Sequence, residues 1–191
     1  MSLRASTLNA ATLLETARPY PANIWNPQEH MSGAISPTLL ADLRRGDLGS
    51  LHALLAGWTR GPALTALLDA RIEGENQYTL LTYAAWRGQA DAVRLLLESG
   101  ASVGATTGCG STALFIACYE GQLDCVRLLL GGNADAGEAT DGGVTPLFIA
   151  CQKGQLECVR LLLAAGAAVE KAVNDGTTPL SAASQTGQID C

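Results

Sequence analysis

The stretch Thr145–Gly166, TPLFIACQKGQLECVRLLLAAG, recurs along the chain at a constant interval. The frame occurs 33 residues earlier, at Thr112–Asn133, as TALFIACYEGQLDCVRLLLGGN, and fifteen of the twenty-two positions are identical. It returns at Thr79 as TLLTYAAWRGQADAVRLLLESG and at Thr178 as TPLSAASQTGQIDC. A fixed period over four copies indicates a repeat architecture.

Each copy predicts a pair of short helices. Thr145 is a typical N-cap residue, Pro146 suits the first helical position, and Gly154 ends this first helix. A second helix then runs through Leu163, with Gly166 as a left-handed C-cap. At about 100° per residue, its leucine, valine and cysteine side chains cover one face. Two helices of this length cannot bury that face alone, but stacked copies can.

The period, the Thr-Pro-Leu opening, Ala150, Gly154 and the Val-x-x-Leu-Leu run resemble ankyrin repeats. The resemblance covers residues 79–191 and extends more loosely back to about residue 38. It implies an all-α solenoid of helix-turn-helix units with β-turn finger loops. The family's histidine after the leucine is replaced here, and an apolar stack of the two phenylalanines is expected in place of its hydrogen bonds. The replacing residues are Thr82, Phe115, Phe148 and Ser181.

Outside the full copies the chain divides as follows. Residues 36–57, SPTLLADLRRGDLGSLHALLAG, repeat the helix-Gly-helix pattern and predict a degenerate N-terminal capping repeat. About nine residues are inserted after it, around Trp58–Leu68, where we expect an extra short helix. The expected units are an irregular or disordered leader (1–35), the capping repeat with its insertion (36–73), repeats at 74–106, 107–139 and 140–172, and a truncated repeat (173–191).

The leader and the last copy carry further expectations. The first eighteen residues are rich in Ala, Ser, Thr and Leu, which faintly resembles an organellar transit peptide; a disordered tail or a docked helix is the alternative. Trp25 is a docking residue or packs on its own domain. The fourth copy stops at Cys191, before its VRLLL run, so we expect it to be the least stable.

Charge excludes several classes of partner. Lys and Arg number 12 and Asp and Glu 18, giving a net charge of −6. This balance argues against a nucleic-acid backbone or an anionic membrane as the main partner. No apolar run approaches the roughly 20 residues of a membrane helix. We expect a cytoplasmic protein, with the nucleus also open.

The cysteines fall into rows with the repeat period: Cys118 and Cys151, then Cys125, Cys158 and Cys191, with Cys109 outside the frame. Neighbouring helices pack at about 8–10 Å, while a disulfide needs Cα atoms within about 7 Å, so equivalent cysteines should not bridge. The chain has no CxxC pair and two histidines, His30 and His52, which argues against zinc. We interpret the rows as reduced core cysteines. The alternative, a redox sensor, needs an exposed thiolate.

No motif of an enzyme is present, so we predict no catalytic, cofactor-binding or metal-binding residue. Carboxylates recur three residues before arginines on the second helices, which predicts solvent-exposed i,i+3 ion pairs. An arginine ladder for an acidic partner is the alternative. The pairs are Asp91 and Arg94, Asp124 and Arg127, and Glu157 and Arg160.

Protein binding is the function that these observations leave open. The resemblance implies that partners contact the finger loops and the residues that end the first helices. Trp86 and Tyr119 hold the same slot one repeat apart, so we expect them side by side, without a core role, as a binding hot spot. Alternatively, Trp86 covers the junction with the N-terminal cap. The neighbouring Arg87, Glu120 and Lys153 alternate in charge and are expected to pair. The full candidate set is Tyr78, Trp86, Arg87, Ser111, Tyr119, Glu120, Val144, Gln152 and Lys153.

These residues predict a non-enzymatic scaffold or adaptor, monomeric, that binds a protein partner on its concave face and finger loops. The alternative is the targeting region of a longer protein, a signalling enzyme or ubiquitin-ligase adaptor, that continues beyond Cys191. The resemblance does not identify the partner.

Overall fold

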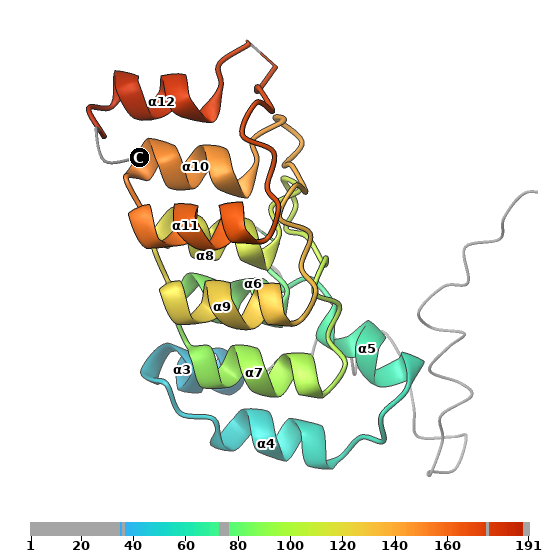
Figure 1. The fold of residues 1–191 in the computed structure, drawn as a ribbon. Coiled ribbons are helices and arrows are strands. Elements are labelled where there is room, and N and C mark those ends of the chain that lie inside the picture. Colours follow the sequence, from blue (N-terminus) through green and yellow to red (C-terminus); the bar gives the residue numbers. More distant parts are fainter. Residues whose placement is uncertain (1–34, 36, 73–76, 175, 189–191) are drawn as a thin grey trace, which may run out of the picture.

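The computed structural model describes residues 35, 37–72, 77–174 and 176–188. The helices in these residues, numbered as in Figure 1, are α3 (Pro37–Arg45), α4 (Gly49–Ala56), α5 (Pro62–Leu68), α6 (Leu80–Trp86), α7 (Ala90–Glu98), α8 (Ala113–Glu120), α9 (Leu123–Gly131), α10 (Pro146–Lys153), α11 (Leu156–Ala164) and α12 (Pro179–Gln185). No strand forms within the same ranges, where Thr106 and Thr112 make an isolated antiparallel bridge.

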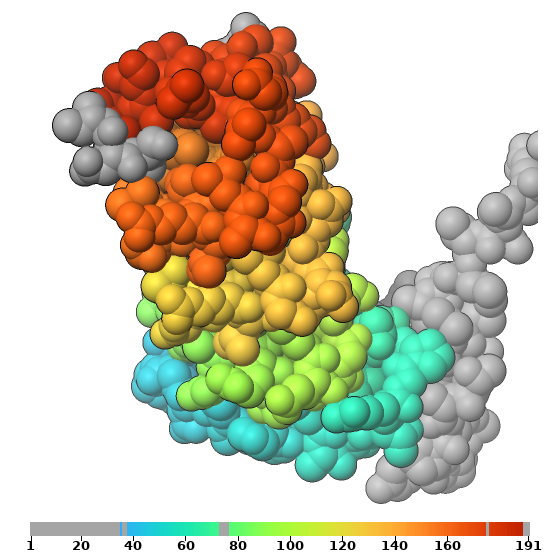
Figure 2. Space-filling view, viewed as in Figure 1, coloured from blue at the N-terminus to red at the C-terminus, as the bar shows by residue number. Residues whose placement is uncertain are grey.

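The helices are stacked in two rows (Figure 1). The first helices, α6, α8, α10 and α12, pack on one another in order, and the second helices α7, α9 and α11 form the other row. Each second helix also packs on the first helix of its own repeat. In the space-filling view the repeats succeed one another as layers, from green to red (Figure 2). The predicted all-α solenoid is confirmed.

Threonine side chains begin the first helices, as the sequence predicts. The hydroxyls of Thr79, Thr112, Thr145 and Thr178 each accept a hydrogen bond from the backbone N–H three residues on. Where that residue is Thr82 or Ser181, its own hydroxyl accepts from the N-cap N–H and completes a capping box. Phenylalanine cannot do so. Phe148 is buried and Phe115 half-buried, but the described residues hold no aromatic pair between them, so the expected stack of the two rings is wrong.

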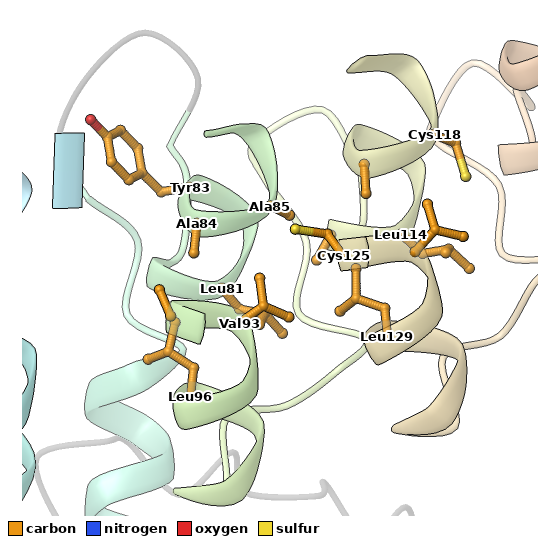
Figure 3. Close-up of a cluster of buried hydrophobic side chains, with 14 of the residues drawn as sticks. Leu81, Tyr83, Ala84, Ala85, Val93, Leu96, Leu114, Cys118, Cys125 and Leu129 are labelled. Carbon is orange, nitrogen blue, oxygen red and sulfur yellow. The ribbon is translucent and has the colours of Figure 1, made fainter. Parts of the chain in front are cut away.

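The core lies between the two rows, and one leucine slot shows how stacking buries it. Leu81, Leu114 and Leu147 are 0%, 1% and 2% exposed. Figure 3 shows Leu81 and Leu114 from the first helices beside Val93 and Leu129 from the second. Leu180 holds the same slot in the last repeat and is 72% exposed. The burial of this leucine therefore depends on the layers that cover it.

Glutamine side chains couple successive repeats, which the sequence analysis missed. Gln122 and Gln155 are the N-cap residues of α9 and α11, but neither makes a side-chain capping bond. Instead, the side chains of Gln122, Gln155 and Gln188 lie where a Cβ would stand on the left-handed glycines Gly88, Gly121 and Gly154 of the preceding repeat. Gly187, at the same place in the last repeat, has nothing within 4 Å.

This arrangement makes a matched pair of substitutions informative. Gly187→Ala should cost about 1–2 kcal/mol, because alanine is strained at a φ of 74°. Gly121→Ala has the same strain at 71° and also displaces Gln155, so we expect roughly 2–5 kcal/mol in urea unfolding. Equal losses would show that Gln155 does not hold the two repeats together.

Among the described residues, the helices α3, α4 and α5 close the N-terminal end of the stack. The helix α5 lies in the inserted segment, with Leu64, Leu67 and Leu68 buried. Thr65 Oγ1 donates to the Gly100 carbonyl oxygen at 2.9 Å, just beyond the end of α7. The predicted leader, with Trp25 and the transit-like composition, lies outside the described residues. The unit boundaries given above stay predictions.

Candidate functional site

The finger loops between repeats are short turns with a glycine in the left-handed region. In the second finger, Gly110 N–H donates to Thr107 O at 3.2 Å, and Thr107 N–H donates to Ser111 O at 3.0 Å. Gly110 has a φ of 75°. In the first finger Gln77 holds this position at a φ of 47°, a conformation that is costly for a residue with a Cβ. The loops project along one side of the stack (Figure 1).

The ends of the first helices meet these loops. Helical side chains point back toward the N-terminus, so Trp86 and Tyr119, at the ends of α6 and α8, lie over the preceding turns. Together with the second finger they form a pocket of about 170 Å³. Its lining residues are Tyr78, Trp86, Thr107, Cys109, Ser111, Phe115, Ile116, Tyr119 and Glu120.

Of the nine predicted binding residues, the structure brings five to this pocket: Tyr78, Trp86, Ser111, Tyr119 and Glu120. Arg87 and Lys153 contact its rings from outside, whereas Val144 and Gln152 are half-buried one repeat further on and do not line it. The prediction missed Thr107, Cys109, Phe115 and Ile116. Helical spacing offered a signal for two of them, because Phe115 and Ile116 precede Tyr119 and Glu120 by four residues.

Trp86 makes ring contacts beside the junction with the N-terminal cap. Its ring stacks on Tyr78, with centroids 5.7 Å apart and planes at 11°, and meets Tyr83 edge-on at 5.8 Å. The Tyr83 hydroxyl accepts from Arg44 Nε at 2.8 Å, which links α6 to α3. These contacts support the alternative, that Trp86 covers the junction with the N-terminal cap, while its side chain stays 37% exposed and outside the core, as expected.

Tyr119 differs from Trp86 in its surroundings. It is 43% exposed, and within the described ranges its ring pairs with no other aromatic ring, so the two residues share a pocket without stacking. The contact that its ring makes is with a cation: the Lys153 ammonium lies 4.3 Å from the ring centroid. Tyr119 thus combines exposure with few structural contacts.

The expected pairing of Arg87, Glu120 and Lys153 is also wrong. Arg87 lies over the Trp86 ring at 5.5 Å, and Lys153 lies over Tyr119. Glu120 forms no ion pair in the part of the chain that the structure describes. Of the pairs predicted on the second helices, Arg160 Nη1 and Glu157 Oε1 approach to 3.4 Å, and the other two do not form among the described residues. Such exposed pairs contribute about 0.2–1 kcal/mol at most.

Cys109 differs from the other described cysteines in its exposure to solvent. None of the five described cysteines forms a disulfide; Cys118, Cys125, Cys151 and Cys158 are buried and Cys109 is exposed. Burial, with a smaller effect of the Asp124 carboxylate, raises the pKa of Cys125 to about 11. Hydrogen bonds from the Ser111 and Thr107 hydroxyls lower the pKa of Cys109 below its ordinary value, because they stabilise the thiolate.

We expect selective labelling of Cys109 by a thiol reagent in native protein, tested in a Cys191→Ser background. The thiolate is the reactive form, so a lowered pKa shifts the midpoint of the rate against pH to a lower pH. Ser111→Ala removes the largest cause and should move that midpoint upward. Labelling of the four buried cysteines as fast as Cys109 would contradict these burial assignments.

The described residues support neither a metal site nor a membrane-spanning helix. They contain no group of three or more His, Cys, Asp or Glu side chains placed to hold a metal ion. None of their helices is long and apolar enough to cross a membrane. His52 is exposed on α4, with Nδ1 2.9 Å from the Leu48 carbonyl oxygen, and His30 lies outside the described ranges.

Comparison with known proteins agrees with the repeat geometry. The family described as ankyrin repeats (3 copies) matches residues 46–139, 81–173 and 114–191. The human protein tRNA endonuclease ANKZF1 is 39% identical to this chain over 90 residues, which are 47% of this chain and 11% of that protein. The similarity therefore concerns a small part of the longer relative.

Proposed function

The chain belongs to the ankyrin repeat family, and on this premise we propose that it is a non-enzymatic scaffold that binds a protein partner. Ankyrin repeats are generally protein-interaction modules. The partner would sit on the concave face, made by the first helices and the finger loops, and we place the centre of contact at the pocket between α6 and α8. We further propose a monomer in the cytoplasm or nucleus.

The observation that supports this position is the part-exposed pair of aromatic rings at one pocket. Trp86 is 37% and Tyr119 43% exposed, and both line it. Trp, Tyr and Arg dominate the binding energy of protein interfaces, typically near the centre of a contact. Val144, Gln152 and Lys153 would extend the contact to the next repeat.

A photo-crosslinking amino acid placed at two positions tests the proposal. Gln152 stands at the end of α10, on the proposed contact face, and Arg127 is exposed on α9, in the other row. We expect the variant with the crosslinker at 152 to capture a discrete protein from cell extract, and unlabelled wild-type chain to compete for it. Equal capture from position 127, or no competition, would contradict the proposed face.

The human relative favours a second candidate, in which this chain is the targeting region of a longer protein. The matched 90 residues are 11% of that relative, so repeats similar to these occur within a much longer chain. Partner binding would then direct an activity held elsewhere, in a signalling enzyme or a ubiquitin-ligase adaptor. Reading the coding DNA after codon 191 separates the candidates, because an immediate stop codon excludes this one.

A further inference from the structure

We propose that the pocket between α6 and α8 receives a basic side chain of the partner, and in particular an arginine. This inference rests on the proposed function, because it names the chemistry of the group that the same site binds. Its basis is the lining: four aromatic rings and one carboxylate, that of Glu120, with no cation among the lining residues.

The carboxylate is available to a ligand. Glu120 is exposed at the end of α8 and forms no ion pair within the described residues. The two nearby cations lie outside the lining and are already placed over rings, Arg87 over Trp86 and Lys153 over Tyr119. A ligand cation that enters the pocket can pair with Glu120 and contact the Phe115 ring, over which no cation of the described residues lies.

The rest of the lining suits the shape of arginine. Phe115 and Ile116 offer apolar surface to its methylene stem. The Thr107 and Ser111 hydroxyls lie 3.2 and 3.4 Å from the Cys109 sulfur at the finger, and these groups offer acceptors for guanidinium N–H groups. The planar guanidinium also stacks on aromatic faces, which a lysine ammonium does less well.

Other side chains fit the pocket less well. An acidic side chain would meet the Glu120 carboxylate, and an apolar one would cover that carboxylate without pairing it. The volume of about 170 Å³ is far above the roughly 10–15 Å³ that one water needs. The net charge of −6 also attracts a basic segment.

Three small probes test the inference on the full chain: acetyl-arginine amide, acetyl-citrulline amide, which has the same shape without the charge, and acetyl-glutamate amide. Binding is followed by NMR through the Trp86 indole N–H and the Ser111 backbone amide. We expect the arginine probe to shift both signals and to bind at least tenfold more tightly than the citrulline probe. Glu120→Gln should abolish this preference, and the matched control Glu138→Gln, a carboxylate outside the pocket, should keep it.

Equal binding of citrulline, tighter binding of glutamate, or no shift with any probe would overturn the inference. These outcomes are distinguishable from failure of the proposed function. If the arginine probe fails while the crosslink from position 152 persists, the face binds a partner by other chemistry. If the crosslink from position 152 is also lost, both the proposed contact face and the proposed arginine pocket are contradicted.

Discussion

Replacing Leu114 by alanine is expected to lower the free energy of unfolding by about 2–5 kcal/mol, because the substitution opens a cavity in a layer that α6, α8 and α10 enclose. Leu114 is 1% exposed. Leu180 holds the same repeat position but is 72% exposed, so its replacement should cost less than about 1 kcal/mol. Comparing the stability losses of these two variants distinguishes the effect of burying leucine between repeats from any intrinsic effect of leucine in this helix.

Urea unfolding followed by circular dichroism measures both variants, and Leu147→Ala should behave like Leu114→Ala. Because each repeat contacts only its neighbours, the Leu114 variant can also unfold in two steps, as the halves of the stack uncouple. Similar losses at positions 114 and 180 would mean that the helix phase assigned here is wrong.

Amide hydrogen exchange is expected to be at least about 100-fold faster in α12 than in α8–α11, equivalent to about 2.8 kcal/mol of local stability. The helix α12 packs on α10, but its Leu180 side chain is exposed, and Gly187 has no glutamine from a following layer. The helices α8, α9 and α10 pack on helices of neighbouring repeats on both sides, and α11 packs on α9 and α10.

Exchange read by mass spectrometry at peptide resolution distinguishes these regions. Equal protection in α12 and α8 would contradict the account of stacking. It would also show that something other than the described contacts covers the last helix.

The sequence predicts those parts of the fold that depend on residues close together in the chain. Thr145, Pro146 and Gly154 act within their own turn, so their roles as N-cap, first helical residue and left-handed C-cap follow from residue type and spacing alone. The leucine slot at Leu114 follows from helical periodicity. The period of 33 then places every copy in the same frame.

The features that the sequence analysis missed depend on contacts between repeats. Gln155 is an unremarkable polar residue in the sequence, and only stacking places it over Gly121. Whether the ring of Trp86 meets Tyr78 or Tyr119 depends on rotamers, since both lie within reach. Exposed Arg87 has several partners of similar energy, and so its choice of a ring over Glu120 could not be predicted from charge alternation.

Tyr119→Ala shows whether the face around the α6–α8 pocket binds a protein partner. A variant of Trp86 is less informative, because its ring also contacts residues at the junction with the cap. The measurement is the affinity of the variant for the protein captured from position 152, beside its stability in urea, with Arg127→Ala as the control. We expect a loss in binding free energy of about 2 kcal/mol or more, roughly 30-fold in affinity, with stability changed by about 0.5 kcal/mol or less. An affinity equal to that of wild type would contradict it.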